Sequence, residues 1–250
     1  MQLSDVSVRF GGLSALSEVS FAVSPGEVVA VIGPNGAGKT SLFNVITGYV
    51  PPSSGEVRFG GERIDGLHPH AISARGVRRT FQNGGLFADL TVLENVLSGL
   101  HTQIKDNLFG ILFGLPGSRS AERQAVKQAR ELLAIMDIQH LADYPASKLS
   151  GGQQRMVEIV RALATNPPLL LLDEPAVGLA PPVRVQLINT IRRLAEERNL
   201  GILVIEHAIE MVMSMSDRII VLNNGEKIAE GTPDEVRNNE DVLEAYLGHA

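Results

Sequence analysis

The sequence predicts an α/β protein whose main sheet is largely parallel. Three observations support this prediction. The β-branched run Val28 to Ile32 is followed by a glycine-rich turn and then by a segment typical of a helix. Short apolar runs alternate with helical patterns after residue 163, which is the order that parallel strands require. Residues 86–162 carry mostly helical patterns, so they predict an α-helical insertion.

Composition narrows the class of protein. The chain has 250 residues, of which 44% are apolar and 20% charged, and its formal net charge is −6. These values predict a packed globule, and the mildly acidic balance argues against nucleic acid as a partner. The absence of cysteine excludes disulfides and Cys-based metal sites. The longest stretch without charged residues, Thr40 to Gly55, contains Pro51-Pro52, so we expect no membrane span and, from the N-terminal residues, no signal peptide.

The N-terminal third is predicted to be rich in strands. Residues 6–10 and 19–23 alternate between apolar and polar side chains, as half-buried strands do. Val28 to Ile32 is apolar throughout and predicts a strand buried on both faces. A helix over residues 41–48 and a short strand over 56–59 follow. The strands that precede the glycine-rich turn predict an N-terminal antiparallel β subdomain.

The remainder of the chain alternates between helices and strands. Apolar residues recur at helical spacing over 121–136, and a second helix opens at Ser150 and is stopped by Asn166-Pro167-Pro168. Further strands are predicted over 169–172, 201–206 and 218–222, with a helix over 185–197. Asn223-Asn224-Gly225 predicts a hairpin turn into residues 227–229, and 234–247 predicts a terminal helix or a pair of turns.

The glycine-rich turn matches the phosphate-binding pattern G-x-x-x-x-G-K-[ST]. Its residues are Gly33, Pro34, Asn35, Gly36, Ala37, Gly38, Lys39 and Thr40. Glycines allow backbone N–H groups to converge on phosphate oxygens, and the following helix contributes its positive end. The Lys39 ammonium can reach the β- and γ-phosphates, and the Thr40 hydroxyl can bind Mg²⁺. Because the complete pattern lies between a predicted strand and a predicted helix, it predicts a P-loop NTPase.

A pair of acidic residues completes this pattern. Asp173 and Glu174 follow four consecutive leucines, so they are expected at the carboxyl edge of a parallel sheet. We expect Asp173 to hold Mg²⁺, directly or through water, and Glu174 to orient or deprotonate an attacking water. Taken alone, these two motifs do not distinguish among the kinds of P-loop NTPase.

A third segment distinguishes among the kinds of P-loop NTPase. It contains an N-capping serine, two glycines and the start of a helix, in the order Leu149, Ser150, Gly151, Gly152, Gln153, Gln154, Arg155. This segment resembles the signature of ATP-binding-cassette (ABC) ATPases, and the resemblance covers essentially the whole chain. It implies a single ABC ATPase domain over 1–250, with a RecA-like core and β subdomain in 1–85 and 163–250. The helical subdomain would span 86–162 and carry the signature.

The resemblance also implies roles for single residues. Gln82 resembles the glutamine that contacts Mg²⁺ and the attacking water, and His207 resembles the switch histidine that contacts the γ-phosphate. Phe10 would stack on adenine, and Ser41 would contact the α-phosphate. The catalytic set would thus be Lys39, Gln82, Glu174 and His207, with Thr40, Gln82 and Asp173 at the metal. ATP would also be bound by Ser150, Gly151, Gly152 and Gln153. One departure is Ala180, where the family often has Asp, and this change puts coupling between protomers in doubt.

The family implies a particular mode of action. Two cassettes would form a head-to-tail dimer, each ATP lying between one phosphate loop and the other chain's signature. The second cassette would be identical or related. Transmembrane permease subunits would be direct partners and an external solute-binding protein an indirect one. The chain would then be a peripheral Mg²⁺-dependent ATPase at the cytoplasmic face of a bacterial or archaeal plasma membrane.

A closer resemblance concerns the transported solute. Residues 79–83, 90–96, 206–207 and 238–248, together with the long insert at 101–120, resemble ATP-binding subunits of branched-chain amino-acid importers. Ala208 departs from that pattern, where Asp is usual. Urea or amide importers and lipopolysaccharide-type exporters remain alternatives. A soluble chromosome or repair ATPase is less consistent, because only positions 83–149 separate Gln82 from Ser150 and they contain no sustained heptads.

Overall fold

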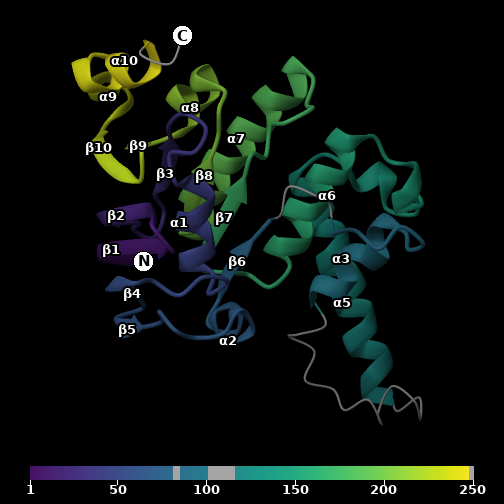
Figure 1. Ribbon diagram of the computed structural model, residues 1–250. Coiled ribbons are helices and arrows are strands. Elements are labelled where there is room, and N and C mark those ends of the chain that lie inside the picture. The colour runs from purple at the N-terminus through teal and green to yellow at the C-terminus, as the bar shows by residue number, and fades with distance from the viewer. Residues whose placement is uncertain (81–84, 101–115, 248–250) are drawn as a thin grey trace. The chain divides into compact units, whose positions relative to one another are not determined.

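A computed structural model describes residues 1–80, 85–100 and 116–247, and the side chains of 116–122 and 247 are not described (Figure 1). The chain forms two compact units. The first unit comprises Met1–Arg79, Pro168–Ala176 and Ile191–Ala250, and the second comprises Thr80–Pro167 and Val177–Thr190. The helical unit of the structure thus includes residues 177–190 besides the segment 86–162. Gln82 and residues 101–115 of the insert lie outside the described residues.

The first unit contains two sheets. The antiparallel sheet has the order β2-β1-β4-β5, formed by β1 (Gln2–Phe10), β2 (Leu13–Ala22), β4 (Ser54–Phe59) and β5 (Glu62–Arg63). The six-stranded sheet has the order β10-β9-β3-β8-β7-β6. Its strands are β3 (Val28–Ile32), β6 (Val77–Arg79), β7 (Leu169–Asp173), β8 (Gly201–Ile205), β9 (Arg218–Asn223) and β10 (Glu226–Gly231).

The six-stranded sheet confirms the predicted α/β class. All pairs from β9 to β6 are parallel, and only β10 is antiparallel to its neighbour β9. The strands β3, β7 and β8 are buried at every position, which explains their unbroken apolar sequences. Because β3, β8 and β7 are adjacent and parallel, the loops after them leave the same edge of the sheet.

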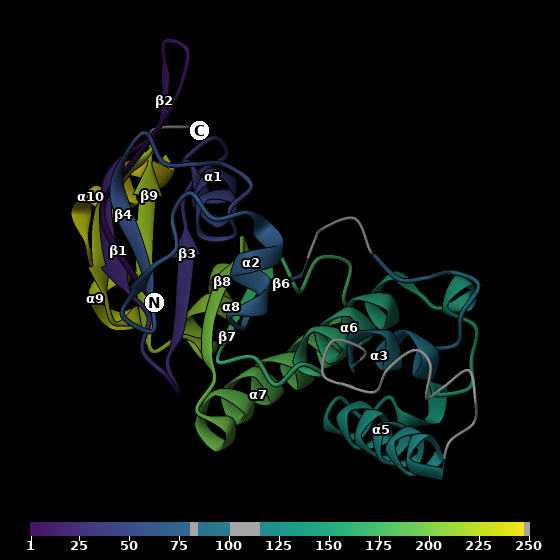
Figure 2. The ribbon, with the colours of Figure 1, turned by 90° about the horizontal axis from the view of Figure 1, so that it is seen from below.

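Helices of the first unit include α1 (Lys39–Ile46), α2 (Pro69–Ala74) and α8 (Ile209–Met215). The predicted terminal segment forms two short helices, α9 (Pro233–Arg237) and α10 (Glu240–Leu247). A capping box between Thr232 and Glu235 opens α9. Figure 2 shows α9 and α10 near β9. The helix α9 contacts both β9 and β10, and α10 contacts β10.

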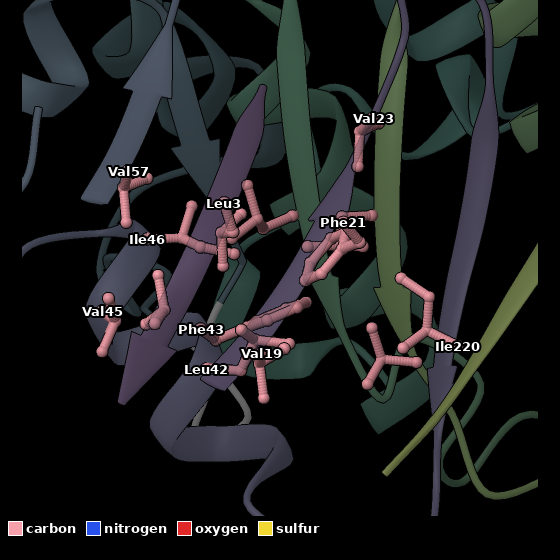
Figure 3. Packing of buried hydrophobic residues seen from close by; sticks show 14 of the residues in the cluster. Leu3, Val19, Phe21, Val23, Leu42, Phe43, Val45, Ile46, Val57 and Ile220 are labelled. Atoms are coloured by element: carbon pink, nitrogen blue, oxygen red, sulfur yellow. The ribbon is translucent and has the colours of Figure 1, made fainter. Parts of the chain in front are cut away.

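Apolar side chains from both sheets and α1 form one core. Leu3, Val19 and Phe21 of the antiparallel sheet face Leu42 and Phe43 of α1 (Figure 3). The cluster extends to apolar residues of β3, β7, β8 and β9. Phe10, in contrast, ends β1 with half of its surface exposed (50%), so the predicted alternation does not bury it.

The second unit is helical. Its elements are α3 (Val92–Leu100), α5 (Pro116–Ile135) and α6 (Gly151–Leu163), with 3₁₀ turns at Gln139–Leu141 and Ala146–Lys148. Both α3 and α5 pack against α6. The helix α7 (Pro181–Arg198) begins in the second unit and ends in the first. None of the helices in the described ranges is both long enough and apolar enough to span a membrane.

Candidate active site

The loop between β3 and α1 has a backbone that requires glycine at two positions. Gly33 has a φ of 149° and Gly38 a φ of 102°. A Cβ atom at Gly33 would lie 2.1 Å from the Leu222 carbonyl oxygen, and one at Gly38 would lie 2.5 Å from the Ala15 carbonyl oxygen. The glycines of the sequence pattern therefore allow both a left-handed backbone and close packing against neighbouring chain segments.

The Lys39 ammonium lies within this loop. Its Nζ donates hydrogen bonds to the carbonyl oxygens of Gly33 at 2.7 Å and Pro34 at 2.9 Å. Burial lowers the pKa of Lys39, and the nearby Glu174 carboxylate partly opposes that effect. The chain thus holds a cation at the place where the sequence pattern predicts phosphate.

Glu174 and His207 meet across the ends of β7 and β8. His207 Nε2 lies 3.0 Å from Glu174 Oε1, and both side chains are partly exposed. The backbone N–H of Glu174 donates to the Ile205 carbonyl at 2.9 Å. Glu174 has a φ of 47°, a left-handed conformation that is uncommon outside glycine. Such backbone strain is often found at functional sites.

A buried carboxylate supports this pair. Glu206 is 2% exposed and lies between the end of β8 and His207. Its Oε1 accepts a hydrogen bond from the Ala176 N–H, and its Oε2 accepts from the N–H groups of His207 and Ala208. Glu206 therefore fixes the turns after Glu174 and before α8. The sequence analysis gave Glu206 no role, although a glutamate at the end of an apolar strand was a usable signal.

These residues surround a pocket of about 590 Å³. Its lining joins the loop after β3, the acidic residue after β7 and the aromatic end of β1. Sequence-predicted residues in this lining are Phe10, Asn35, Gly36, Ala37, Gly38, Lys39, Thr40, Ser41, Glu174 and His207. The half-exposed Phe10 ring and the backbone amides of the loop offer an apolar face and an anion site in one cavity.

Asp173 is the last residue of β7 and is 4% exposed. Its Oδ2 accepts a hydrogen bond from Arg79 Nη2 at 2.7 Å, an ion pair that the sequence analysis did not anticipate. The Thr40 hydroxyl and the Asp173 carboxylate are hard oxygen donors of the kind that Mg²⁺ prefers. Among the described residues, no group of three or more His, Cys, Asp or Glu side chains is placed to hold a metal. This donor set fits an ion that takes most of its ligands from phosphate and water.

The signature segment forms the start of α6 in the second unit. Ser150 is its N-cap, with a capping box in which the Gln153 N–H donates to Ser150 Oγ and the Ser150 N–H donates to Gln153 Oε1. Ser150, Gly151, Gly152 and Gln153 line a pocket of about 510 Å³ that Ala180 also borders. A Cβ atom at Gly151 would meet nothing within 4 Å. The segment is thus an open helix N-terminus, suited to an anion.

Comparison with known proteins identifies the family. The model of the ABC transporter family matches residues 16–177. The chain belongs to the ABC transporter family. A second model, of the branched-chain amino acid ATP-binding cassette transporter, matches residues 226–250, the stretch that holds β10, α9 and α10.

Individual ABC proteins support this assignment. The chain is 44% identical to the high-affinity branched-chain amino acid transport ATP-binding protein BraF of Pseudomonas aeruginosa, over all of this chain and 98% of that protein. It is 35% identical to the ADP conformation of an ATP-binding cassette of an ABC transporter, with a TM-score of 0.85 over 99% and 98% of the two chains. A dimeric cassette in a post-hydrolysis state with ADP and Pi is 29% identical, with a TM-score of 0.78 over 93% and 98%.

The comparisons confirm the predicted ABC ATP-binding subunit and its P-loop fold. Family membership implies that the chain binds and hydrolyses ATP. In this chain, the pocket that Lys39 lines is also lined by Glu174 and His207, which contact each other.

Proposed function

We propose that this chain is the ATP-hydrolysing subunit that powers a branched-chain amino acid importer, with Mg²⁺ as its metal. One observation carries the catalytic part of the proposal. Glu174 and His207 lie 3.0 Å apart and line the same pocket as Lys39. The branched-chain match at residues 226–250 and the 44% identity to BraF support the transported solute.

ATP binding would use the pocket as the structure presents it. The half-exposed Phe10 ring would offer a stacking face for adenine, and the loop residues Asn35 to Thr40, which line the same pocket, would offer backbone amides to the triphosphate. Lys39 Nζ, now bonded to two loop carbonyls, would exchange them for β- and γ-phosphate oxygens. Ser41 lies in the same lining and would contact the α-phosphate.

Thr40 and Asp173 would hold Mg²⁺, together with Gln82. When bound, the ion would neutralise charge on the β- and γ-phosphates and orient them. The Glu174 carboxylate would accept a hydrogen bond from the attacking water and take its proton as the oxygen approaches phosphorus. The γ-phosphorus–oxygen bond to the β-phosphate then breaks, and ADP and phosphate leave. His207, held by Glu206, would steady Glu174 and contact the γ-phosphate.

The signature residues would act on a second cassette. Ser150 to Gln153 form an exposed helix N-terminus in the second unit, and a related cassette forms a dimer with ADP and Pi. Each ATP would then lie between one chain's loop and the partner's signature. Membrane-spanning permease subunits would convert closure of this dimer into transport, and the chain would then lie at the cytoplasmic face of the membrane.

The experiment that tests this function is purification of the tagged full chain from its own membranes in mild detergent. We expect membrane-spanning subunits to co-purify, and we expect ATP hydrolysis by the complex that EDTA abolishes. The Glu174→Gln complex should assemble equally well and lose about 100-fold or more in kcat, because the general base is removed. The matched control is Glu244→Gln, at an exposed position on α10.

Two results would contradict the proposal. Recovery of the chain without any membrane-spanning partner would remove the transport role. Full activity of the assembled Glu174→Gln complex would remove the assigned catalytic carboxylate.

A further inference from the structure

A buried arginine links the carboxylate of Asp173 to the helix that follows the phosphate loop. Arg79 ends β6, which pairs in parallel with β7, the strand that Asp173 ends. Arg79 Nη2 donates to Asp173 Oδ2 at 2.7 Å, and the two side chains are 7% and 5% exposed. The pair is therefore shielded from solvent, unlike a surface salt bridge.

The same guanidinium is tied to α1. Arg79 Nη1 donates to Asn44 Oδ1 at 2.8 Å and to Thr47 Oγ1 at 3.4 Å. Its Cζ lies 5.3 Å from the centre of the Phe43 ring. All three partners belong to α1 or to its C-cap, and α1 begins with Lys39 and Thr40. Arg79 thus fixes the position of Asp173 relative to the helix that carries Thr40.

Charge and geometry explain why arginine suits this place. A planar guanidinium can donate to Asp173 with one nitrogen and to Asn44 and Thr47 with another, which a lysine ammonium cannot do from the same position. A buried carboxylate without a cation is costly, so removing Arg79 would leave Asp173 free to turn away from its present orientation. Groups that orient a metal ligand are worth about 10–100-fold in metal affinity.

We propose that Arg79 is a positioning residue that holds Asp173 in the orientation required for Mg²⁺ bound with ATP. The inference rests on the proposed function, which assigns Asp173 to the metal. Arg79 lies outside the phosphate loop, the acidic pair and the signature, so it would be a further residue that supports the metal site.

The test compares ATP affinity with and without the metal, on a Glu174→Gln background that prevents turnover. Isothermal titration of the full chain with ATP in excess Mg²⁺, and then with ATP in EDTA, gives the factor by which Mg²⁺ tightens binding. We expect Arg79→Gln to reduce this factor by about 10–100-fold and to leave affinity for ATP in EDTA within about twofold. Arg79→Lys, which keeps the charge and loses the planar fork, should recover part of the factor.

Arg78→Gln is the matched control, because Arg78 is next to Arg79 on β6 and points to the other face, where it donates to the Ser73 carbonyl. Its Mg²⁺ factor should stay within about twofold of the parent. A merely structural role for Arg79 would lower thermal stability and leave the Mg²⁺ factor unchanged, and this result would overturn the proposal. A larger Mg²⁺ factor in Arg79→Gln would overturn it as well, because the arginine would then be a competitor of the metal.

A second variant keeps the proposal testable if Arg79→Gln does not fold. Asn44→Ala removes one tether of Arg79 and leaves the ion pair with Asp173. It should reduce the Mg²⁺ factor severalfold, and an unchanged factor would overturn the inference. If the Glu174→Gln parent itself binds ATP no more tightly with Mg²⁺, the metal role of the proposed function fails and the inference falls with it. A normal parent with an unaffected Arg79→Gln variant refutes the inference alone.

Discussion

Glu206 lies outside the pocket lining but sets the geometry of Glu174 and His207, which line the pocket. Its carboxylate accepts hydrogen bonds from three backbone N–H groups, on Ala176, His207 and Ala208. These amides belong to the two turns that position Glu174 and His207. Because Glu206 is buried, water cannot replace a lost acceptor.

We therefore expect Glu206→Gln to lower kcat by about tenfold or more and to leave ATP affinity nearly unchanged. Glutamine offers one acceptor oxygen, and its NH₂ group would face a backbone N–H. The unfolding free energy should fall by about 1–3 kcal/mol for the unsatisfied donor. Steady-state kinetics and urea denaturation measure the two effects, and Glu210→Gln, exposed on α8, is the control. Equal kcat values in both variants would show that His207 does not depend on Glu206.

The sequence predicted site residues that act through a contiguous pattern, and it missed those that act through the fold. Lys39 follows from the loop pattern, and Glu174 follows from its place after an apolar strand. His207 required the family resemblance. Arg79 and Asp173 are 94 positions apart, and their ion pair depends on the pairing of β6 with β7. No local pattern contains that information.

At the scale of elements, a buried asparagine joins α3 to the segment before it. Asn95 is 0% exposed, and its Oδ1 accepts a hydrogen bond from the Phe87 N–H at 2.8 Å. Its Nδ2 donates to the carbonyl oxygens of Phe87 and Thr91. Phe87 and Asn95 are eight positions apart, so the Asn95 side chain holds the segment that leads into α3.

Asn95→Leu keeps the branched shape of this side chain, with somewhat larger end groups, and removes its hydrogen bonds. We expect the unfolding free energy to fall by about 1–3 kcal/mol, because the Phe87 N–H loses its acceptor in a buried position. Hydrogen exchange at the Phe87 amide should accelerate more than exchange at the amides of α3. Ser98→Ala removes only a hydroxyl bond to the Asn95 carbonyl and is the control. Unchanged protection at Phe87 would contradict this account of the segment.

Long apolar runs predicted most strands and helices, whereas the shortest elements were not predicted. The runs at 28–32 and 169–172 are buried strands, as expected. The three-residue β6 and the two-residue β5 have too few positions to show a period of two. The helix α8 has no side-chain cap hydrogen bond, so the usual start signal is missing. Residues 234–247 divide into two helices at Asn238-Asn239, where Asn239 Oδ1 accepts a hydrogen bond from the Val242 N–H at the start of α10.

At the scale of the whole molecule, each compact unit contains a helix N-terminus that we propose to bind ATP. The first unit has the phosphate loop before α1, and the second has Ser150 and the glycines that open α6. A related cassette forms a dimer with ADP and Pi, which supports the proposed use of both segments at one ATP site. The sequence predicted both segments because each is contiguous, whereas the place of residues 177–190 in the second unit depends on packing.

The central claim is that ATP joins two cassettes through the loop of one and the signature of the other. Sedimentation of the Glu174→Gln chain with saturating ATP and Mg²⁺ tests it most directly. The matched variant adds Gly151→Glu, where a side chain has open space and an acidic group suits the first turn of α6. Its fold should be intact, and its negative charge should repel the partner's triphosphate. We predict a dimer for Glu174→Gln and a monomer for the double variant. A dimer in both would contradict this role of the signature, and a monomer in both would contradict ATP-driven pairing of two identical cassettes.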